Sequence, residues 1–243
     1  MRNGNTSHQV SIVIPCYNDE SKLSQLLTQI DQLPSPPLEV IVVDAAASKS
    51  CQNLCLAHGA AWLAAEPCRG KQLLAGAAIA RGDVLWFLHA DVGLSDDPID
   101  AIERVLENGA VGGYFKFKFD RPRTWQAGLL EPFIALRCRH GIPYGDQGLF
   151  MRKSAYQQAG GHAPWPLFEE VPLVNGLRQQ GKFATLKEAI FVNPRRWQHD
   201  GWWRRTWENR KLALAFALGK QPNELAKRYR SHVTNFDYDK KEA

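Results

Sequence analysis

His89 and Asp91 stand two positions apart, directly after an apolar run that predicts a buried strand. In an extended backbone, residues at this spacing project to the same side. An imidazole nitrogen and a carboxylate oxygen can then bind one divalent cation, and this pair of ligands favours Mn²⁺ or Mg²⁺. Because such ions complete their shell with phosphate and water, the pair predicts a metal and diphosphate site. From spacing alone, the alternative is an aspartate that caps a helix beside a histidine on a loop.

Other polar residues could bind a nucleotide near this predicted strand end. Asp44 ends the second predicted strand, where its carboxylate could accept hydrogen bonds from a nucleobase or a ribose; capping of the next helix is the alternative. Three cations surround a predicted helix start at Gly70 and would add to its dipole, which suits a diphosphate: Arg69, Lys71 and Arg81. Solvated surface charge explains these three equally well.

Two adjacent carboxylates, Glu169 and Glu170, could supply a general base. Their mutual repulsion and partial burial would raise the pKa of one of them. A transferase needs such a base to take the proton from an acceptor hydroxyl. An acidic helix N-terminus without a catalytic role is the alternative interpretation.

Two further segments have residue types that suit a ligand. Asp146 and Gln147 stand between two glycines, which allows the backbone to approach a ligand closely, although a plain turn explains the pattern as well. Arg195 and Arg196 could hold a phosphate, and the ring of Trp197 could stack beside them. Packing of that tryptophan beside exposed arginines is the alternative.

The elements that must position these residues follow a β-α-β order in the first half of the chain. Continuous apolar runs predict strands, and amphipathic or alanine-rich stretches predict helices between them. The strands are expected at 10–14 (ended by Pro15), 40–43, 60–64 and 84–88, and the helices at 20–33, 48–58 and 70–80. This order predicts an α/β fold with a mostly parallel sheet and helices on both faces. Since ligands bind beyond the carboxyl ends of such strands, Pro15, Asp44 and His89–Asp91 should converge on one crevice.

The second half of the chain is less regular. Alternation predicts a strand at 114–119, and a helix at 125–139 should be interrupted by Pro132. We also expect a tight loop at 145–148, a helix that follows the acidic pair, and two terminal helices at 202–219 and 223–230. We therefore expect a disordered segment at 1–9, the main domain at 10–200, a helical appendage at 201–231 and a frayed tail at 232–243.

Composition narrows the class of protein. With 243 residues, 44% of them hydrophobic and 23% charged, the chain can form a globular core. No apolar stretch is long enough to cross a bilayer, and residues 1–9 lack the apolar region of a signal peptide, so a cytoplasmic location is expected. Five cysteines without a CxxC pair fit reduced thiols.

Charge is unevenly distributed along the chain. Between Arg195 and Arg230 stand ten Lys/Arg and three acidic residues, together with four of the eight tryptophans. A basic, aromatic segment of this kind predicts peripheral contact with a membrane surface through residues 202–211. Packing of these tryptophans onto the main domain is the alternative. No motif for nucleic-acid binding accompanies the segment, so nucleic acid is not an expected partner.

Eight segments, taken in order, resemble glycosyltransferase family 2, and within it the arsenosugar-biosynthesis-type glycosyltransferases. They span roughly residues 10 to 200 and match the family as follows: SIVIPCYN at 11–18, VIVVD at 40–44, GKQ at 70–72, ARGD at 80–83, FLHAD at 87–91, GDQG at 145–148, FEE at 168–170 and RRW at 195–197. The order of the segments makes the match more specific than any one of them.

The resemblance implies a GT-A fold and a hexosyltransferase-like, inverting enzyme that uses a divalent metal and a UDP- or GDP-sugar donor. It assigns Asp91, and with less family support His89, to the metal, and Glu170 with Glu169 to the general base. It assigns Asp44 to the nucleoside pocket. Other residues of the donor and acceptor pocket on the matching segments are Pro15, Asn18, Lys71, Asp83, Ala90, Asp146, Gln147, Arg196 and Trp197.

The chain departs from the family pattern at two places. The segment Ala45–Ser50 lacks the usual second acid, and Lys49 brings the opposite charge. Pro172 follows the acidic pair, and Glu170 is longer than the usual Asp. A degenerate fold that binds a nucleotide, lipid or partner without turnover therefore stays an alternative. A sugar-nucleotidyltransferase is disfavoured because residues 16–20 do not form a Gly-rich loop.

Overall fold

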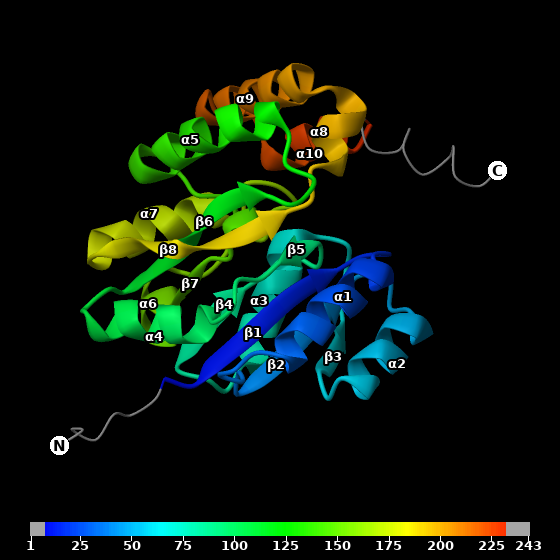
Figure 1. Ribbon diagram of the computed structural model, residues 1–243, viewed down its shortest axis with the longest axis vertical. Coiled ribbons are helices and arrows are strands. Elements are labelled where there is room, and N and C mark those ends of the chain that lie inside the picture. The colour runs from blue at the N-terminus through cyan, green and yellow to red at the C-terminus, as the bar shows by residue number, and fades with distance from the viewer. Residues whose placement is uncertain (1–7, 232–243) are drawn as a thin grey trace.

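A computed structural model describes residues 8–231 of the chain; most of the predicted disordered start and the whole predicted frayed tail lie outside this range. Within it the chain forms a sheet of eight strands in the order β3-β2-β1-β4-β7-β6-β8-β5 (Figure 1). The strands are β1 Val10–Cys16, β2 Glu39–Asp44, β3 Ala61–Ala64, β4 Val84–Phe87, β5 Val92–Gly93, β6 Gly112–Phe119, β7 Phe150–Arg152 and β8 Phe183–Val192.

Helices cover both faces of the sheet. They are α1 Glu20–Asp31, α2 Lys49–Ala57, α3 Arg69–Ile79, α4 Pro98–Glu107, α5 Trp125–His140, α6 Lys153–Gln158, α7 Glu170–Gln180, α8 Arg195–Asp200, α9 Trp202–Ala217 and α10 Pro222–Ser231, with a 3₁₀ turn η1 at Gly145–Gln147. Consecutive residues of β1 point to opposite faces: Ile12 and Ile14 pack in one apolar cluster with α1, and Val13 packs in the other with α3. β1 pairs in parallel with β2 and β4, and β2 pairs in parallel with β3, so the predicted parallel first half is confirmed.

The second half of the sheet is mixed. β7 runs antiparallel to both β4 and β6, whereas β6 and β8 are parallel, and β5 is antiparallel to β8. β5, α4, β8 and α8 were not predicted from the sequence. Only part of the long β8 has the residue pattern of a strand, because exposed Lys187 and half-buried Glu188 interrupt its apolar residues.

Two prolines lie within continuous elements, although Pro15 was predicted to end its strand and Pro132 to interrupt its helix. Pro15 lies inside β1, where it pairs with Val43 of β2. β4 ends opposite Val13, so Pro15 has no β4 residue beside it and its missing N–H costs no ladder hydrogen bond there. Pro132 lies inside a continuous α5 on an exposed face, where water can satisfy the carbonyl that it leaves unpaired.

Four helices, α5, α8, α9 and α10, gather beyond the edge of the sheet that carries the ends of β1 and β4 (Figure 1). α8 packs on α9, α9 packs on α10, and α5 packs on β6. Trp197 and Trp202 anchor this group, because the centroid of each ring lies 5.0 Å from that of Phe119 in a T-shaped contact. None of the helices within residues 8–231 combines the length and hydrophobicity needed to cross a bilayer.

Candidate active site

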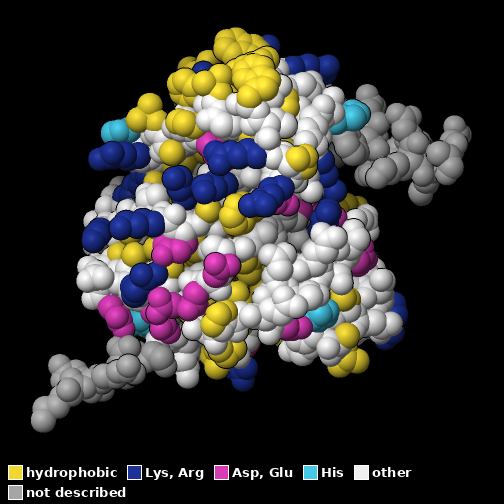
Figure 2. Space-filling view, in the orientation of Figure 1, with side chains coloured by type: hydrophobic (Ala, Val, Ile, Leu, Met, Phe, Trp, Pro, Cys, Tyr) yellow, Lys and Arg dark blue, Asp and Glu magenta, His cyan; other side chains and the backbone are white. Residues whose placement is uncertain are grey.

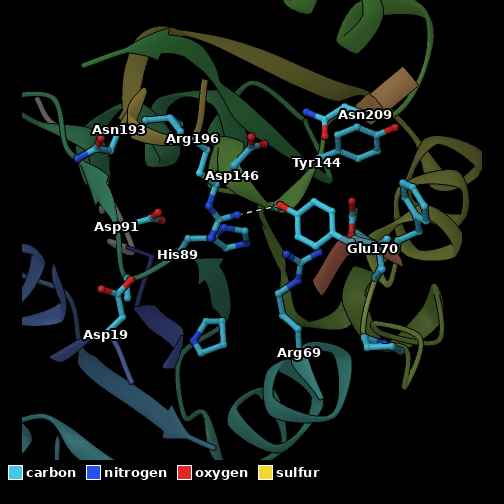
Figure 3. A pocket seen from close by; sticks show the side chains of 18 of the residues that line it. Asp19, Arg69, His89, Asp91, Tyr144, Asp146, Glu170, Asn193, Arg196 and Asn209 are labelled. Carbon is cyan, nitrogen blue, oxygen red and sulfur yellow. Dashed lines mark hydrogen bonds between the residues drawn. The ribbon is translucent and has the colours of Figure 1, made fainter. Parts of the chain in front are cut away.

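A cavity of about 400 Å³ lies between the carboxyl ends of β1 and β4 and the group of helices beyond them. Loops after β1, β4 and β8, the starts of α3 and α7, and the turn η1 all contribute side chains to its wall (Figure 3). Of the residues predicted for the site, eight line this cavity: Pro15, His89, Ala90, Asp91, Asp146, Glu170, Arg196 and Trp197. Three strand ends were expected to converge on one crevice. Those at Pro15 and at His89–Asp91 do so, and the one at Asp44 does not.

Two carboxylates, those of Asp19 and Asp91, lie on one side of the cavity. Asp19, which precedes α1, and Asp91, which follows β4, both point toward Arg195 (Figure 3 shows the two carboxylates). The Nη2 atom of Arg195 lies 3.5 Å from a carboxylate oxygen of Asp19 and 3.8 Å from one of Asp91. Burial and the charge of Asp91 raise the pKa of Asp19, while Arg195 opposes the shift. This part of the cavity therefore holds two carboxylates that attract a cation.

His89 lies near Asp91 and is half-buried, with its Nε2 atom shielded from solvent. Its Nε2 atom has no hydrogen-bond partner. Gly145 of η1 faces that atom so closely that a Cβ there would lie 2.9 Å from it. Burial, followed by the positive charge of Arg69, lowers the pKa of His89. The ring is therefore neutral near pH 7, which is the form that can bind a metal.

These residues fit a divalent cation that takes few protein ligands. Asp91 offers an oxygen, and the unpartnered Nε2 of His89 offers a nitrogen, a donor pair compatible with Mn²⁺ or Mg²⁺. Within residues 8–231 no group of three or more His, Cys, Asp or Glu side chains is arranged to hold an ion. Any cation here would need oxygens from phosphate and water to complete its shell.

The acidic pair at the start of α7 is divided between two environments. Glu169 is fully buried and forms an ion pair with Arg69, in which Nη2 donates to Oε2 at 3.0 Å. Burial would raise the pKa of Glu169, but the charge and hydrogen bond of Arg69 outweigh it and lower the pKa. Glu169 is therefore a structural anion that does not line the cavity, and it holds Arg69 on the wall.

Glu170 lines the cavity on the side opposite Asp91 (Figure 3). Its Oε2 atom is buried without a hydrogen-bond partner. Burial, and next the charge of Glu169, raise the pKa of Glu170 to about 8. A carboxyl group with this pKa can accept or give up a proton near neutral pH, as a general base must.

The turn η1 brings a third carboxylate into the cavity. Gly148 ends the turn with φ 58°, and this left-handed conformation lets the chain reverse before β7. Asp146 lines the cavity, and its Oδ1 is buried and unpartnered. Tyr144 lines it too, below the guanidinium of Arg137, which lies 4.3 Å from the ring centroid. The sequence prediction included Asp146 but not Tyr144 or Arg137.

The C-terminal helices close the cavity. Arg196 of α8 donates to the hydroxyl of Tyr229 on α10 at 2.8 Å, and Arg205 of α9 lies over the same ring. Arg205, Asn209, Leu212 and Tyr229 all line the cavity. Sequence reasoning treated these helices as an appendage and missed all four residues. The only available signal was the high density of arginine and aromatic residues after residue 195.

Five other predicted residues lie outside the cavity wall. Asp44 is fully buried at the end of β2, and its carboxylate accepts from the amides of Ala46 and Ser48 and from the indole of Trp62. It thus holds the loop before α2. The other four are exposed Asn18, Lys71 paired with Glu66, Asp83 at the amino end of β4, and Gln147, which donates to Cys138.

Comparison with known proteins agrees with this architecture. The family model described as Glycosyl transferase family 2 matches residues 11–159, more than half of the chain. A comparison with functionally curated proteins found no match.

Similar solved structures include S. aureus TarS, with a TM-score of 0.56, 14% identity and coverage of 76% of this chain and 35% of that chain. Glucosyl-3-phosphoglycerate synthase from Mycobacterium tuberculosis, solved with Mn²⁺, UDP and glucosyl-3-phosphoglycerate, has a TM-score of 0.54 and 18% identity, and the match covers 79% of this chain and 76% of that chain. The chain spans 58% of a shorter S. aureus TarS structure. At these identities the likeness shows the fold, which is GT-A.

Proposed function

Because this chain belongs to glycosyl transferase family 2, we propose that it transfers a sugar from a nucleotide-diphospho-sugar to an acceptor hydroxyl, with inversion and with the help of a divalent cation. The observation that carries the proposal is the placement of Glu170 across one cavity from Asp91 and His89. An acid–base group and a cation-attracting group on opposite walls are what such a transfer requires.

Glu170 is the proposed general base. Its unpartnered Oε2 would accept the proton of the acceptor hydroxyl as that oxygen attacks the anomeric carbon, and the bond to the diphosphate would break on the opposite face. Asp146 and Tyr144 stand on the wall near Glu170, where hydroxyl groups of a sugar or acceptor could bind. Glu169 would keep Arg69 in place beside the departing phosphates.

Asp91 and His89 are the proposed ligands of the cation, and Mn²⁺ and Mg²⁺ are both compatible with this donor pair. A cation bound there would supply electrostatic stabilisation of the diphosphate charge. Arg196 would add a second positive group on the same leaving group. Support for this arrangement comes from the mycobacterial synthase structure, which holds Mn²⁺ and UDP. Whether the donor is a UDP- or GDP-sugar stays a prediction, as does the narrower arsenosugar-type resemblance.

A second candidate, a fold that binds its nucleotide without turnover, is favoured by one observation. The carboxylate of Asp44, expected in the nucleoside pocket, is occupied by hydrogen bonds from its own loop and from Trp62. A nucleoside would then be held by other groups. The proposed cytoplasmic location and the contact of residues 202–211 with a membrane are separate from this question.

Turnover tests the proposal. We would incubate the chain with Mn²⁺ and a panel of UDP- and GDP-sugars and measure release of UDP or GDP. Glu170→Gln keeps the size of the side chain but cannot take a proton, so we expect the rate to fall at least about 100-fold, within the usual range for loss of a general base.

Glu107→Gln, at the exposed end of α4, is the matched control and should leave the rate unchanged. An E170Q variant as fast as the control would refute the assignment of the base. If wild type binds a nucleotide but turns over no donor, the binding fold is supported instead.

A further inference from the structure

Large hydrophobic side chains are exposed mainly on two neighbouring helices. Of the twelve that are exposed within residues 8–231, eight lie on α5, on α9 or at the residue that ends α9. We call these eight the α5–α9 face: Trp125, Leu129, Phe133, Leu136, Trp203, Trp207, Leu214 and Leu218. Scattered apolar side chains are normal on a protein surface, but a contiguous group marks an interaction site.

The spacing of these residues places them in a stripe along one side of each helix. On α5 they recur every three or four positions from Trp125 to Leu136, so they share one side of the helix. On α9 the spacings from Trp203 to Leu218 are four, seven and four positions, which also places these residues on one side of the helix. The stripes meet where the rings of Trp125 and Trp203 lie 6.3 Å apart. Figure 2 shows the resulting patch as the yellow cluster at the top of the molecule, over α5 and α9.

The charged residues around this face are almost all basic. The exposed charged residues of the two helices are Arg139, Arg204, Arg210 and Lys211, besides Arg137, whose guanidinium lies over Tyr144 in the cavity. The two glutamates of these helices are less accessible: Glu131 is buried, and Glu208 is half-buried and paired with Arg204. Lys211 lies 5.7 Å from the ring of Trp207, so charge and aromatic surface are in direct contact.

We propose that the α5–α9 face docks onto the surface of a bilayer that contains anionic phospholipid. Tryptophan and leucine side chains would enter the headgroup region, and the surrounding Lys/Arg would bind the lipid phosphates and carboxylates. A second copy of the chain fits less well, because a symmetric pair would bring the same positive residues against each other. The charge thus selects the anionic partner.

Docking in this way would also orient the cavity. The opposite sides of the same two helices line it, through Ile134 on α5 and through Arg205, Asn209 and Leu212 on α9. A membrane that contacts the outer side therefore lies one helix thickness from the cavity. The docking proposal stands without the proposed sugar transfer, since it concerns binding alone.

Vesicle binding tests the proposal. The full chain is mixed with vesicles of phosphatidylcholine alone or of phosphatidylcholine with phosphatidylserine, and the bound fraction is measured by flotation. We expect binding to the mixed vesicles, a blue shift of tryptophan fluorescence on binding, and loss of binding at high salt. Equal binding to both kinds of vesicle, or to neither, would overturn the proposal.

Two variants locate the binding surface. Trp203→Ser combined with Trp207→Ser removes exposed rings and should weaken binding about ten-fold or more. Arg210→Glu combined with Lys211→Glu should abolish the preference for phosphatidylserine.

Leu56→Ser is the matched control, because Leu56 is 80% exposed on α2, away from the α5–α9 face. It should bind like wild type, and all variants should keep the wild-type circular dichroism spectrum. If W203S/W207S instead binds vesicles normally but converts a dimeric chain to a monomer, the face is a contact between copies and the membrane proposal is wrong.

Discussion

Glu170 makes a prediction about stability that does not require a substrate. Its pKa in the folded chain is about 8, above the ordinary value of 4.5. Because the folded state holds this proton more tightly than the unfolded state, the carboxyl contributes stability that is full below the ordinary pKa and is lost as pH rises through about 8. In Glu170→Gln, whose side chain does not ionise, this loss of stability with rising pH should be absent.

Urea unfolding at pH values from 4.5 to about 8 measures this effect. The free energy of unfolding of the wild type should fall by a few kcal/mol more than that of E170Q over this interval. Two curves that fall in parallel would mean that Glu170 is ionised in the folded protein at neutral pH. A raised pKa could then not be the reason that Glu170 accepts a proton.

The different roles of Glu169 and Glu170 could not be predicted from the sequence. Adjacent glutamates at a helix start predict one raised pKa but do not say which residue has it. The answer depends on Arg69, a hundred positions earlier, whose guanidinium reaches Glu169 and leaves Glu170 unpaired. Likewise, the unpartnered Nε2 of His89 depends on the approach of Gly145 from a different element.

At the scale of elements, the turn η1 depends on one backbone conformation. Gly148 has φ 58°, and a Cβ there would lie 2.2 Å from Cδ1 of Ile190. Gly148→Ala should therefore destabilise the fold by about 2–4 kcal/mol through strain and overpacking. It should also displace Asp146, which shares the turn.

Gly109→Ala is the matched control for this change. Gly109 also has a positive φ, but a Cβ there would meet nothing within 4 Å, so only backbone strain of about 1–2 kcal/mol is expected. Thermal unfolding compares the two. A G148A variant no less stable than G109A would show that the turn can relax, and that it does not hold Asp146 rigidly.

The first four strands and their helices were predictable because β-α-β units repeat one local pattern. Apolar runs such as Val40–Val43, bounded by polar turns, indicate buried strands without reference to the rest of the chain. β8 was not predictable in this way. Its residues are partly exposed, and it becomes a strand by pairing with β6, which lies about 70 residues earlier. Edge and mixed pairings of this kind depend on tertiary contacts.

At the scale of the whole molecule, the cavity is assembled from two parts of the chain. The match to the glycosyl transferase family covers residues 11–159, which contribute Pro15, Asp91 and Asp146. Glu170, Arg196 and Tyr229 come from the part beyond that match. The matched part thus contributes the predicted cation side of the cavity, and the part beyond the match contributes the proposed base and the C-terminal side of the wall.

The central claim, that the end of β4 binds a cation together with a diphosphate, is tested most directly by calorimetric titration of UDP and of GDP with and without Mn²⁺. Wild type should bind one of the two nucleotides, and only when Mn²⁺ is present. Asp91→Ala should weaken that binding about ten-fold or more, because the cation would lose its carboxylate ligand. Equal affinity with and without Mn²⁺, or equal affinity of the wild type and D91A, would contradict the account.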